Sequence, residues 1–335
     1  MATYKLTPDG NLENISGVIE SENAFYIDPN GYIHCFAFND NQELPGNIKM
    51  EITTDYVLNL AGNSGAPHPG IGWTITSSLN EAKNGLAGCG DILDALCFSG
   101  NTGALVDTTE IWDGSTWATT TDLTEVKYNL AGCGTTSGAL CFGGWTISAR
   151  ISKTGIWDGS TWATTSALNE AKYSLAGCGN VSDALCFGGN TGFPFVSKTE
   201  IWSGSSWATT SALNQDRYKL TGCGTTSGAL SIGGTTGDRV NTTEIWSGSS
   251  WATTSVLNQS KDSFAGCGDI LDALCFGGNT GARVSTTELW NGSSWATTSI
   301  LNQSKDVLAG CGNISDALCF GGTSDTSTAT TEIWA

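Results

Sequence analysis

Residues 172–214 read K-Y-S-L-A-G-C-G-N-V-S-D-A-L-C-F-G-G-N-T-G-F-P-F-V-S-K-T-E-I-W-S-G-S-S-W-A-T-T-S-A-L-N. Four short runs of apolar and threonine residues alternate there with Gly, Asn, Asp and Ser, a pattern that indicates strands joined by turns rather than helices. We name these runs strands a to d in chain order. The pattern recurs along the chain, and the cysteine of its Gly-Cys-Gly tripeptide falls at positions 89, 133, 178, 223, 267 and 311.

Four strands in a repeat of about 44 residues are the signature of one β-propeller blade. Strands a, b and c each occur six times, and the chain stops straight after the sixth strand c, at Trp334-Ala335. The missing sixth strand d lies at the front, in residues 73–80. The sequence therefore predicts an all-β fold over 73–335, a six-bladed propeller of four-stranded blades that strand 73–80 closes into a ring.

The first part of the chain lacks the repeat. Alternating residues in 24–27 and 32–38 predict two strands joined by an Asp-Pro-Asn-Gly turn, and residues 50–60 predict a third. We expect 1–60 to form a small β-rich unit for anchoring or docking, because so few strands are marginal alone. The Gly- and Pro-containing residues 61–72 are expected to be a linker.

Composition excludes several classes of function. Of the 335 residues, 32 are acidic and 14 are basic, a net charge of −18, which argues against nucleic acid or an anionic membrane surface as partner. No run of 18 apolar residues exists, so no membrane insertion is expected, and no signal peptide is recognised at the start. His34 and His68 are the only histidines, and we expect no cofactor, no metal and no His-based catalysis.

The repeats resemble those of kelch-type propellers, through the Gly doublet after strand b, the basic residue before strand a and the Trp of strand d. The repeat motif T-E-I-W-x-G-S-S-W-A-T-T-S-x-L-N is most similar to those of kelch-like proteins of bacteriophages. Residues 17–29, G-V-I-E-S-E-N-A-F-Y-I-D-P, are similar to a motif near the start of phage tail and fibre-associated proteins, from which Glu20 and Glu22-Asn23 depart.

That resemblance implies a non-enzymatic structural protein of the virion, of the tail-fibre or receptor-binding type. Residues 1–60 would attach it to other virion proteins, a homo-oligomer would form in the particle, and the ligand would be a glycan or protein of the host surface. A capsid or tail decoration protein without a receptor role is the first alternative. A carbohydrate-active enzyme and a cytoplasmic peptide-binding scaffold are the others, since the kelch fold serves many functions.

The connections between strands b and c vary while the framework is nearly constant, and variable loops on a rigid scaffold are where recognition occurs. Aromatic and basic side chains in or beside them suit a sugar face or a protein hot spot. The aromatic ones could instead cover a gap or pack on the N-terminal unit. The candidate ligand-binding residues are Trp145, Arg150, Lys153, Phe193, Phe195, Lys198, Arg239 and Arg283.

A second set of charged residues recurs in register. Six basic residues precede strand a: Lys83, Lys127, Lys172, Arg217, Lys261 and Lys305. Five glutamates occupy one position of strand c: Glu110, Glu200, Glu244, Glu288 and Glu332, and Gly155 takes that position in the second blade. Such regularity favours a structural network of ion pairs between adjacent strands. The alternative is an electrostatic rim that meets an acidic or sugar ligand.

Five blades carry two cysteines eight residues apart, such as Cys89 and Cys97. A three-residue turn between them, with Asp94 left-handed, would place the two cysteines directly opposite each other and permit a cross-strand disulfide. Blade four, with Ser231 in place of the second cysteine, favours buried free thiols instead. Zinc is disfavoured because the spacing and the histidines that it needs are missing.

Overall fold

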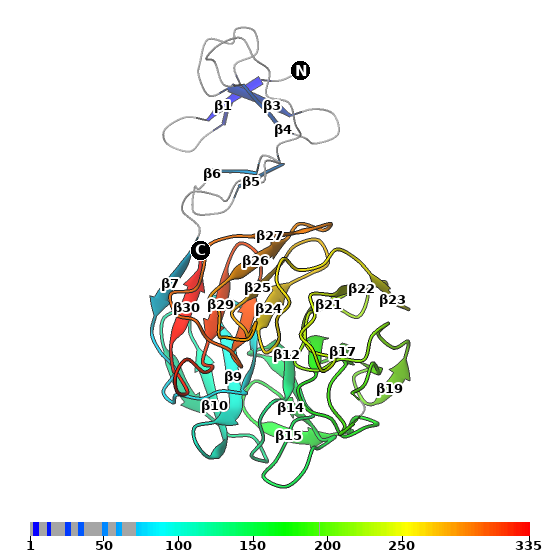
Figure 1. The fold of residues 1–335 in the computed structure, drawn as a ribbon. Coiled ribbons are helices and arrows are strands. Elements are labelled where there is room, and N and C mark those ends of the chain that lie inside the picture. Colours follow the sequence, from blue (N-terminus) through cyan, green and yellow to red (C-terminus); the bar gives the residue numbers. More distant parts are fainter. Residues whose placement is uncertain are drawn as a thin grey trace. The chain divides into compact units, whose positions relative to one another are not determined.

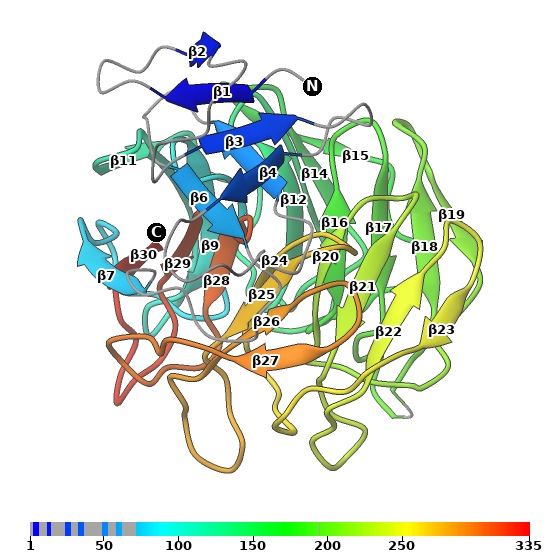
Figure 2. The same ribbon diagram turned by 90° about the horizontal axis from the view of Figure 1, so that it is seen from above.

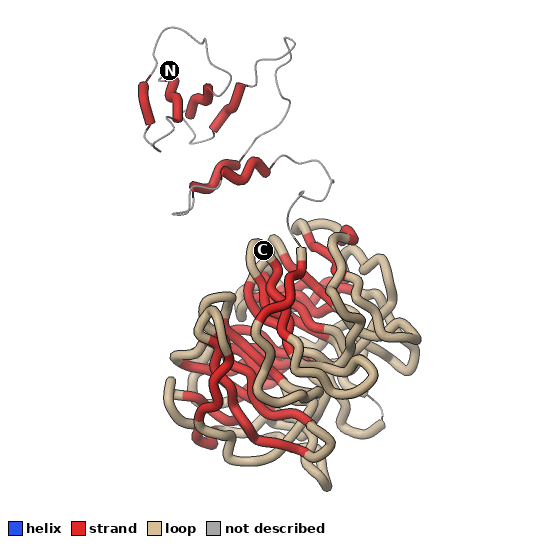
Figure 3. The backbone as a smooth tube through the Cα atoms, turned by 90° about the vertical axis from the view of Figure 1, so that its left-hand side faces the viewer, coloured by secondary structure: helices blue, strands red, loops and turns tan. Residues whose placement is uncertain are grey.

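The structure, a computed structural model, describes residues 3–6, 12–14, 24–27, 33–36, 49–52, 58–61, 72–193 and 195–335. Every regular element in those residues is a β-strand, as Figure 3 shows by colour. The chain divides into two units, 1–66 and 67–335, which are described separately below.

Residues 72–335 form six four-stranded antiparallel sheets, the blades of a propeller, as the repeat count predicts. Strands a are β8 (Ala87–Gly90), β12 (Ala131–Thr135), β16 (Ala176–Gly179), β20 (Thr221–Gly224), β24 (Ala265–Gly268) and β28 (Ala309–Gly312). Strands b are β9 (Ala95–Asn101), β13 (Gly138–Phe142), β17 (Ala184–Phe187), β21 (Ala229–Ile232), β25 (Ala273–Phe276) and β29 (Ala317–Phe320).

Strands c are β10 (Leu105–Trp112), β14 (Thr154–Trp157), β18 (Thr199–Trp202), β22 (Thr243–Trp246), β26 (Thr287–Trp290) and β30 (Thr331–Trp334). Strands d are β11 (Trp117–Thr120), β15 (Trp162–Thr165), β19 (Trp207–Thr210), β23 (Trp251–Thr253), β27 (Trp295–Thr297) and β7 (Trp73–Thr76). Within a blade the order is a-b-c-d, as β16 to β19 show in Figure 2. Strands a of neighbouring blades contact one another around the ring.

The ring closes as the sequence predicts. The sixth blade has the order β28-β29-β30-β7, so the first strand of the propeller pairs with the last strand of the chain, Trp334 opposite Trp73. Figure 1 shows these two strands side by side. The Gly72 N–H also donates to the Ala335 carbonyl at 3.2 Å. All blades are thus complete.

Neighbouring blades pack through a glycine that the sequence repeats in strand a. A Cβ built on Gly88 would lie 2.3 Å from the Phe320 ring, and one on Gly132 would lie 2.4 Å from the Phe98 ring. Phe320 and Phe98 come from strand b of the preceding blade and are fully buried. Only glycine leaves room for such a ring, and this close approach explains the first glycine of the Gly-Cys-Gly motif.

The twelve tryptophans of strands c and d are all buried, which confirms that they belong to the core. Each strand d tryptophan donates from its indole nitrogen to a threonine hydroxyl of the preceding blade, such as Trp162 to Thr109 at 3.0 Å. Each strand c tryptophan donates to a carbonyl in the a–b turn, such as Trp112 to Ile92 at 2.8 Å. The donors are satisfied while the rings fill the space between blades.

The predicted cysteine geometry is wrong. Cys89 lies opposite Leu96, and Cys97 lies opposite Gly88, so the two thiols are on opposite faces of the sheet. The reason is the turn: Gly90 pairs with Ala95, so four residues connect the strands rather than three, and the left-handed residue is Gly90, with φ 104°, rather than Asp94. Each thiol faces a different neighbouring blade, and the eleven cysteines of the propeller are free and buried.

In the N-terminal unit, four strands form a sheet of order β2-β1-β3-β4. They are β1 (Thr3–Leu6), β2 (Leu12–Asn14), β3 (Ala24–Ile27) and β4 (Ile33–Phe36). The predicted pair of strands corresponds to β3 and β4, while the turn between them lies outside the described residues. Of the predicted linker 61–72, residues 62–71 also lie outside the described residues, and Ala61 ends β6. The single strand predicted over 50–60 is instead a hairpin, β5 (Lys49–Ile52) with β6 (Leu58–Ala61). A search of the described residues finds no helix that could cross a membrane.

Candidate functional site

One end of the propeller carries the connections from d to a and from b to c, which we call the loop rim. A closed ring of six backbone hydrogen bonds lies there, between the residues that stand two places after each basic residue. The N–H groups of Asn129, Ser174, Lys219, Ser263, Val307 and Gly85 donate in turn to the carbonyls of Gly85, Asn129, Ser174, Lys219, Ser263 and Val307, at 2.7–3.0 Å. All six residues have φ between 50° and 61°. This ring ties every blade to the next.

Five of the six blades also contain an ion pair that is almost completely buried. In each, the basic nitrogen before strand a meets Oε1 of the strand c glutamate. The pairs are Lys83–Glu110 (3.0 Å), Lys172–Glu200 (3.1 Å), Arg217–Glu244 (2.9 Å), Lys261–Glu288 (3.4 Å) and Lys305–Glu332 (3.2 Å). They join the start of strand a to strand c within one blade. The structure therefore places these charges in the framework, away from any ligand on the surface.

Burial and charge act against each other on these groups. Burial lowers the pKa of Lys172, but the Cys186 sulfur and the Glu200 carboxylate outweigh it, so the pKa is raised above its usual value. Burial lowers the pKa of Arg217 to about 10 although Glu244 opposes it. Both cations stay charged at neutral pH, and each neutralises the carboxylate beside it. Glu200 and Glu244 are thus each engaged by a buried cation.

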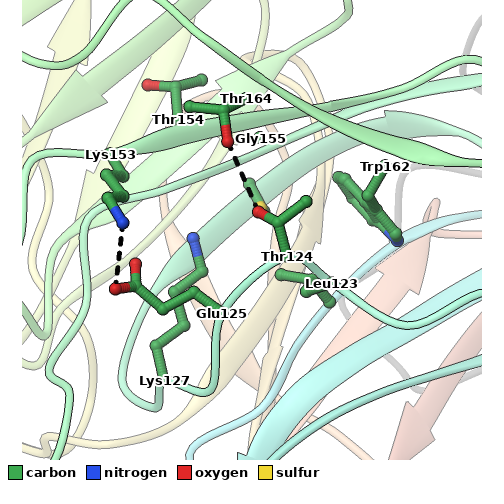
Figure 4. A pocket seen from close by; sticks show the side chains of 10 residues that line it. Leu123, Thr124, Glu125, Lys127, Lys153, Thr154, Gly155, Trp162 and Thr164 are labelled. Atoms are coloured by element: carbon green, nitrogen blue, oxygen red, sulfur yellow. Dashed lines mark hydrogen bonds and ion pairs between the residues drawn. The ribbon is translucent and has the colours of Figure 1, made fainter.

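Blade two departs from this arrangement. Gly155 replaces the glutamate, and Lys127 forms no ion pair within the described residues, although it is only 3% exposed. A small pocket opens beside it, lined by Thr124, Glu125, Cys141, Lys153 and Trp162 among others (Figure 4).

The b–c loops extend from each blade onto the next. Trp145 packs edge-on against Tyr173 at 5.0 Å between ring centroids, and Phe195 stacks on Tyr218 at 4.3 Å. In the following blades the same contact is ionic, and Arg239 pairs with Asp262 at 2.9 Å. Arg283 likewise pairs with Asp306 at 3.1 Å. Trp145 and Phe195 are half-buried by this packing, and the structure thus brings the candidate residues onto one rim.

The candidate ligand-binding residues differ in their exposure and in whether they form ion pairs. Lys153 and Lys198 are exposed but pair with Glu125 and Glu170, each at 3.1 Å. Arg150 is exposed, and no ion pair of its guanidinium is found in the described part of the propeller. Phe193 is 91% exposed. Phe193 and Arg150 are thus the candidates that offer the most unengaged surface.

Sequence reasoning missed four residues of this rim. Ile147 is 85% exposed on the b–c loop of blade two, the same loop as Arg150. Tyr173 and Tyr218 support the loop aromatics from the next blade. The Lys-Tyr or Arg-Tyr dipeptide that recurs in blades two to four was the available signal for the tyrosines. Thr124, which replaces a repeated asparagine, is the fourth, and its departure from the Leu-Asn motif was the signal.

In the described residues, no group of three or more His, Cys, Asp and Glu could hold a metal ion. The thiols are also poor nucleophiles, since burial raises the pKa of Cys97 and of Cys319 to about 12. The loop rim instead presents a shaped surface, aromatic side chains and isolated cations to a binding partner.

Searches against protein-family models and against curated proteins find no match. Among solved structures, the one described as "Structure of YjhT" is similar in fold, with a TM-score of 0.67 and 11% sequence identity. The alignment covers 77% of this chain and 95% of that one. At this identity the likeness supports the fold alone, and the chain is classed as a six-bladed β-propeller with four-stranded blades.

Proposed function

We propose that the protein is a non-enzymatic binding propeller of the kelch type that serves in a bacteriophage virion, as a tail-fibre or receptor-binding protein. The observation that carries the binding role is the exposed apolar surface of the b–c loops in blades two and three. Phe193 and Ile147 extend from those loops into solvent, above a framework that barely varies. The kelch type and the virion rest on the resemblance of the repeats and of residues 17–29.

The loops of blades two and three differ from the rest in length as well as in residue type. Eleven residues separate β13 from β14 and β17 from β18, whereas ten separate β21 from β22. The exposed ring of Phe193, near Arg150, for which no ion pair is found in the described residues, suits a sugar ring or a protein hot spot. We propose a glycan or protein of the host surface as the ligand, and attachment to other virion proteins through residues 1–60.

A decoration protein without a receptor role is the second candidate. The closed ring of backbone hydrogen bonds and the five buried ion pairs favour it, because they describe a rigid body that needs no ligand to be stable. In that case the same N-terminal attachment would serve, and the loop rim would bind nothing.

Binding of the full chain to a panel of bacterial-surface glycans tests the proposal. We expect binding that falls at least tenfold in a variant with Trp145→Ala, Arg150→Ala and Phe193→Ala. The matched control is Leu93→Ala, which removes an exposed apolar side chain from an a–b turn at the other end of the blades. Absence of glycan binding, together with capture of purified virion proteins by the full chain, would favour the decoration role. An equal loss in both variants would contradict the rim as the binding face.

A further inference from the structure

In four blades, one residue of the b–c loop contacts the residue that follows the repeated basic residue of the next blade. The two partners are chemically matched each time: two rings stack, two opposite charges pair, or an amide donates to a hydroxyl. The pairs are Phe195 with Tyr218 (4.3 Å between ring centroids), Arg239 with Asp262 (2.9 Å), Arg283 with Asp306 (3.1 Å) and Asn84 with Ser327 (2.8 Å). These contacts join the loop rim from blade to blade.

Blade two lacks such a match. Arg150 holds the same loop position as Phe195 and Arg239, because each of the three bridges back to the residue after the Gly doublet of its blade. The corresponding residue of blade three is Tyr173, which supplies no carboxylate. Arg150 is exposed, and the part of the propeller that the structure describes contains no ion pair of its guanidinium. The rim therefore holds an arginine without the acid that Arg239 has.

The surroundings of Tyr173 carry positive charge and aromatic rings. Burial and the neighbouring Tyr218 and Tyr128 raise the pKa of Tyr173, and Arg150 opposes them, while no carboxylate of the described residues takes part. A second cation lies on the same half of the rim: the Lys219 nitrogen is 5.7 Å from the centroid of the Tyr218 ring, and the side chain is exposed. This half of the rim thus offers cations to a ligand.

The glutamates two places before the basic residue of blades two and three are already engaged. Glu125 pairs with Lys153 and Glu170 pairs with Lys198, each at 3.1 Å. The net charge of −18 opposes an anionic ligand at long range. At physiological ionic strength, however, exposed charges more than about 8 Å apart are largely screened from each other. The charges next to the ligand therefore decide whether an anion binds.

An exposed aromatic ring lies beside the guanidinium. A Cβ built on Gly192 would lie 3.6 Å from Nη1 of Arg150, so the guanidinium packs against the b–c loop of blade three. Phe193 follows Gly192 directly and is 91% exposed. A guanidinium donates two parallel hydrogen bonds to a carboxylate or a phosphate, and an aromatic ring packs on the apolar face of a sugar. The two side chains together match a sugar that carries an acidic group.

We propose that the ligand of the loop rim is an acidic glycan whose carboxylate or phosphate group binds Arg150. The anion acts toward Arg150 as Asp262 acts toward Arg239, and the sugar ring packs against Phe193. The other half of the rim does not compete for the anion, because its arginines already have acids. This inference rests on the proposed binding role of the rim and narrows the ligand from a glycan or protein to an acidic glycan.

The experiment measures binding of the full chain to two polysaccharides that differ only in charge, polygalacturonate and its methyl ester. We expect the acid to bind about tenfold more tightly or better, with a difference that shrinks as NaCl is raised. Poly(glycerol phosphate) and uncharged dextran form a second pair that shows whether phosphate serves as well. Equal binding of acidic and neutral polymers would overturn the acidic ligand and leave the glycan-binding role standing. Failure of both acidic polymers to bind would also overturn it, and the bacterial-surface glycan panel would still test the broader role.

Three variants locate the site. Arg150→Gln should weaken binding of polygalacturonate about tenfold or more, because hydrogen bonds between charged groups are strong. The matched control is Arg283→Gln, which removes an arginine that Asp306 already engages and should change binding by less than about twofold. Tyr173→Asp gives Arg150 the carboxylate that Arg239 has, and it should abolish binding with Arg150 still in place. Equal losses in Arg150→Gln and Arg283→Gln would refute the proposal, as would full binding by Tyr173→Asp.

Discussion

Blades two and three are built from nearly the same residues, yet they differ at one position of strand c, which is Gly155 in blade two and Glu200 in blade three. Both carry the basic residue before strand a, Lys127 or Lys172, and both carry a Lys–Glu pair at the rim, Lys153–Glu125 or Lys198–Glu170. Blade three completes the inner charge with Glu200 at 3.1 Å from Lys172. Blade two leaves it open.

This difference shows that the fold does not require the repeated ion pair in every blade. Strand c of blade two pairs with its neighbours through Gly155 in the same register as the other blades. A single buried salt bridge contributes little net stability against its desolvation cost, so a blade can lack one. Removing only one member of a pair is strongly destabilising, because the other member is then a buried charge without a partner.

The largest expected effect is a difference in the free energy of unfolding between variants of Lys172 and of Lys127. Lys172→Met leaves Glu200 buried and unpaired, and we expect it to lower the free energy of unfolding by about 3–5 kcal/mol. Lys127→Met removes a cation that forms no ion pair within the described residues and so leaves no buried carboxylate unpaired, and it should change the free energy of unfolding by less than about 1 kcal/mol. Urea unfolding monitored by tryptophan fluorescence measures both.

Equal losses in the two variants would show that Lys127 is held by groups that compensate its charge as well as Glu200 compensates Lys172. The double variant Lys172→Met with Glu200→Gln removes both charges and serves as the control. It should recover part of the loss caused by Lys172→Met alone, because no buried charge then lacks a partner.

A smaller effect comes from the thiol beside the ion pair of blade three. Burial raises the pKa of Cys186 to about 11, against an opposing effect of Lys172. The unfolded thiol ionises near pH 9, so the folded state binds its proton more tightly. The contribution of Cys186 to stability is therefore complete below about pH 9 and is lost as pH rises to about 11, by up to about 3 kcal/mol.

Blade four supplies the matched change, because Ser231 stands at the same position and accepts from Arg217 at 2.9 Å. We expect Cys186→Ser to lose less stability than the parent between pH 9 and pH 11 in urea unfolding. A parallel decline of both proteins with pH would show that Cys186 does not ionise differently in the folded and unfolded states.

The repeat made the fold predictable, since the strand count and the out-of-phase strand d alone fixed six blades and the closure by β7. The cysteine geometry was not predictable, because a shift of one residue in the turn moves a side chain to the other face of the sheet. Asp94 was expected to take the left-handed conformation that Gly90 takes.

The candidate site was predictable in part. The variable loops marked the rim, but the sequence did not show that Arg239 and Arg283 pair with acids of the next blade. The blade two pocket was marked by Gly155 and Thr124 as departures from the repeat. That the two lie together required the structure, because Thr124 belongs to a d–a connection and Gly155 to strand c.

The smallest expected effect concerns the ring of backbone hydrogen bonds, where residue type varies while conformation does not. Val307 holds φ at 55°, a costly value for a β-branched side chain, while Asn129 in blade two holds φ at 52°. Val307→Asn should therefore raise the free energy of unfolding by about 0.5–1 kcal/mol, and Asn129→Val should lower it by a similar amount. Thermal unfolding of the two variants gives shifts of opposite sign if backbone strain decides. Shifts of the same sign would mean that the contacts of each side chain outweigh the cost of its backbone conformation.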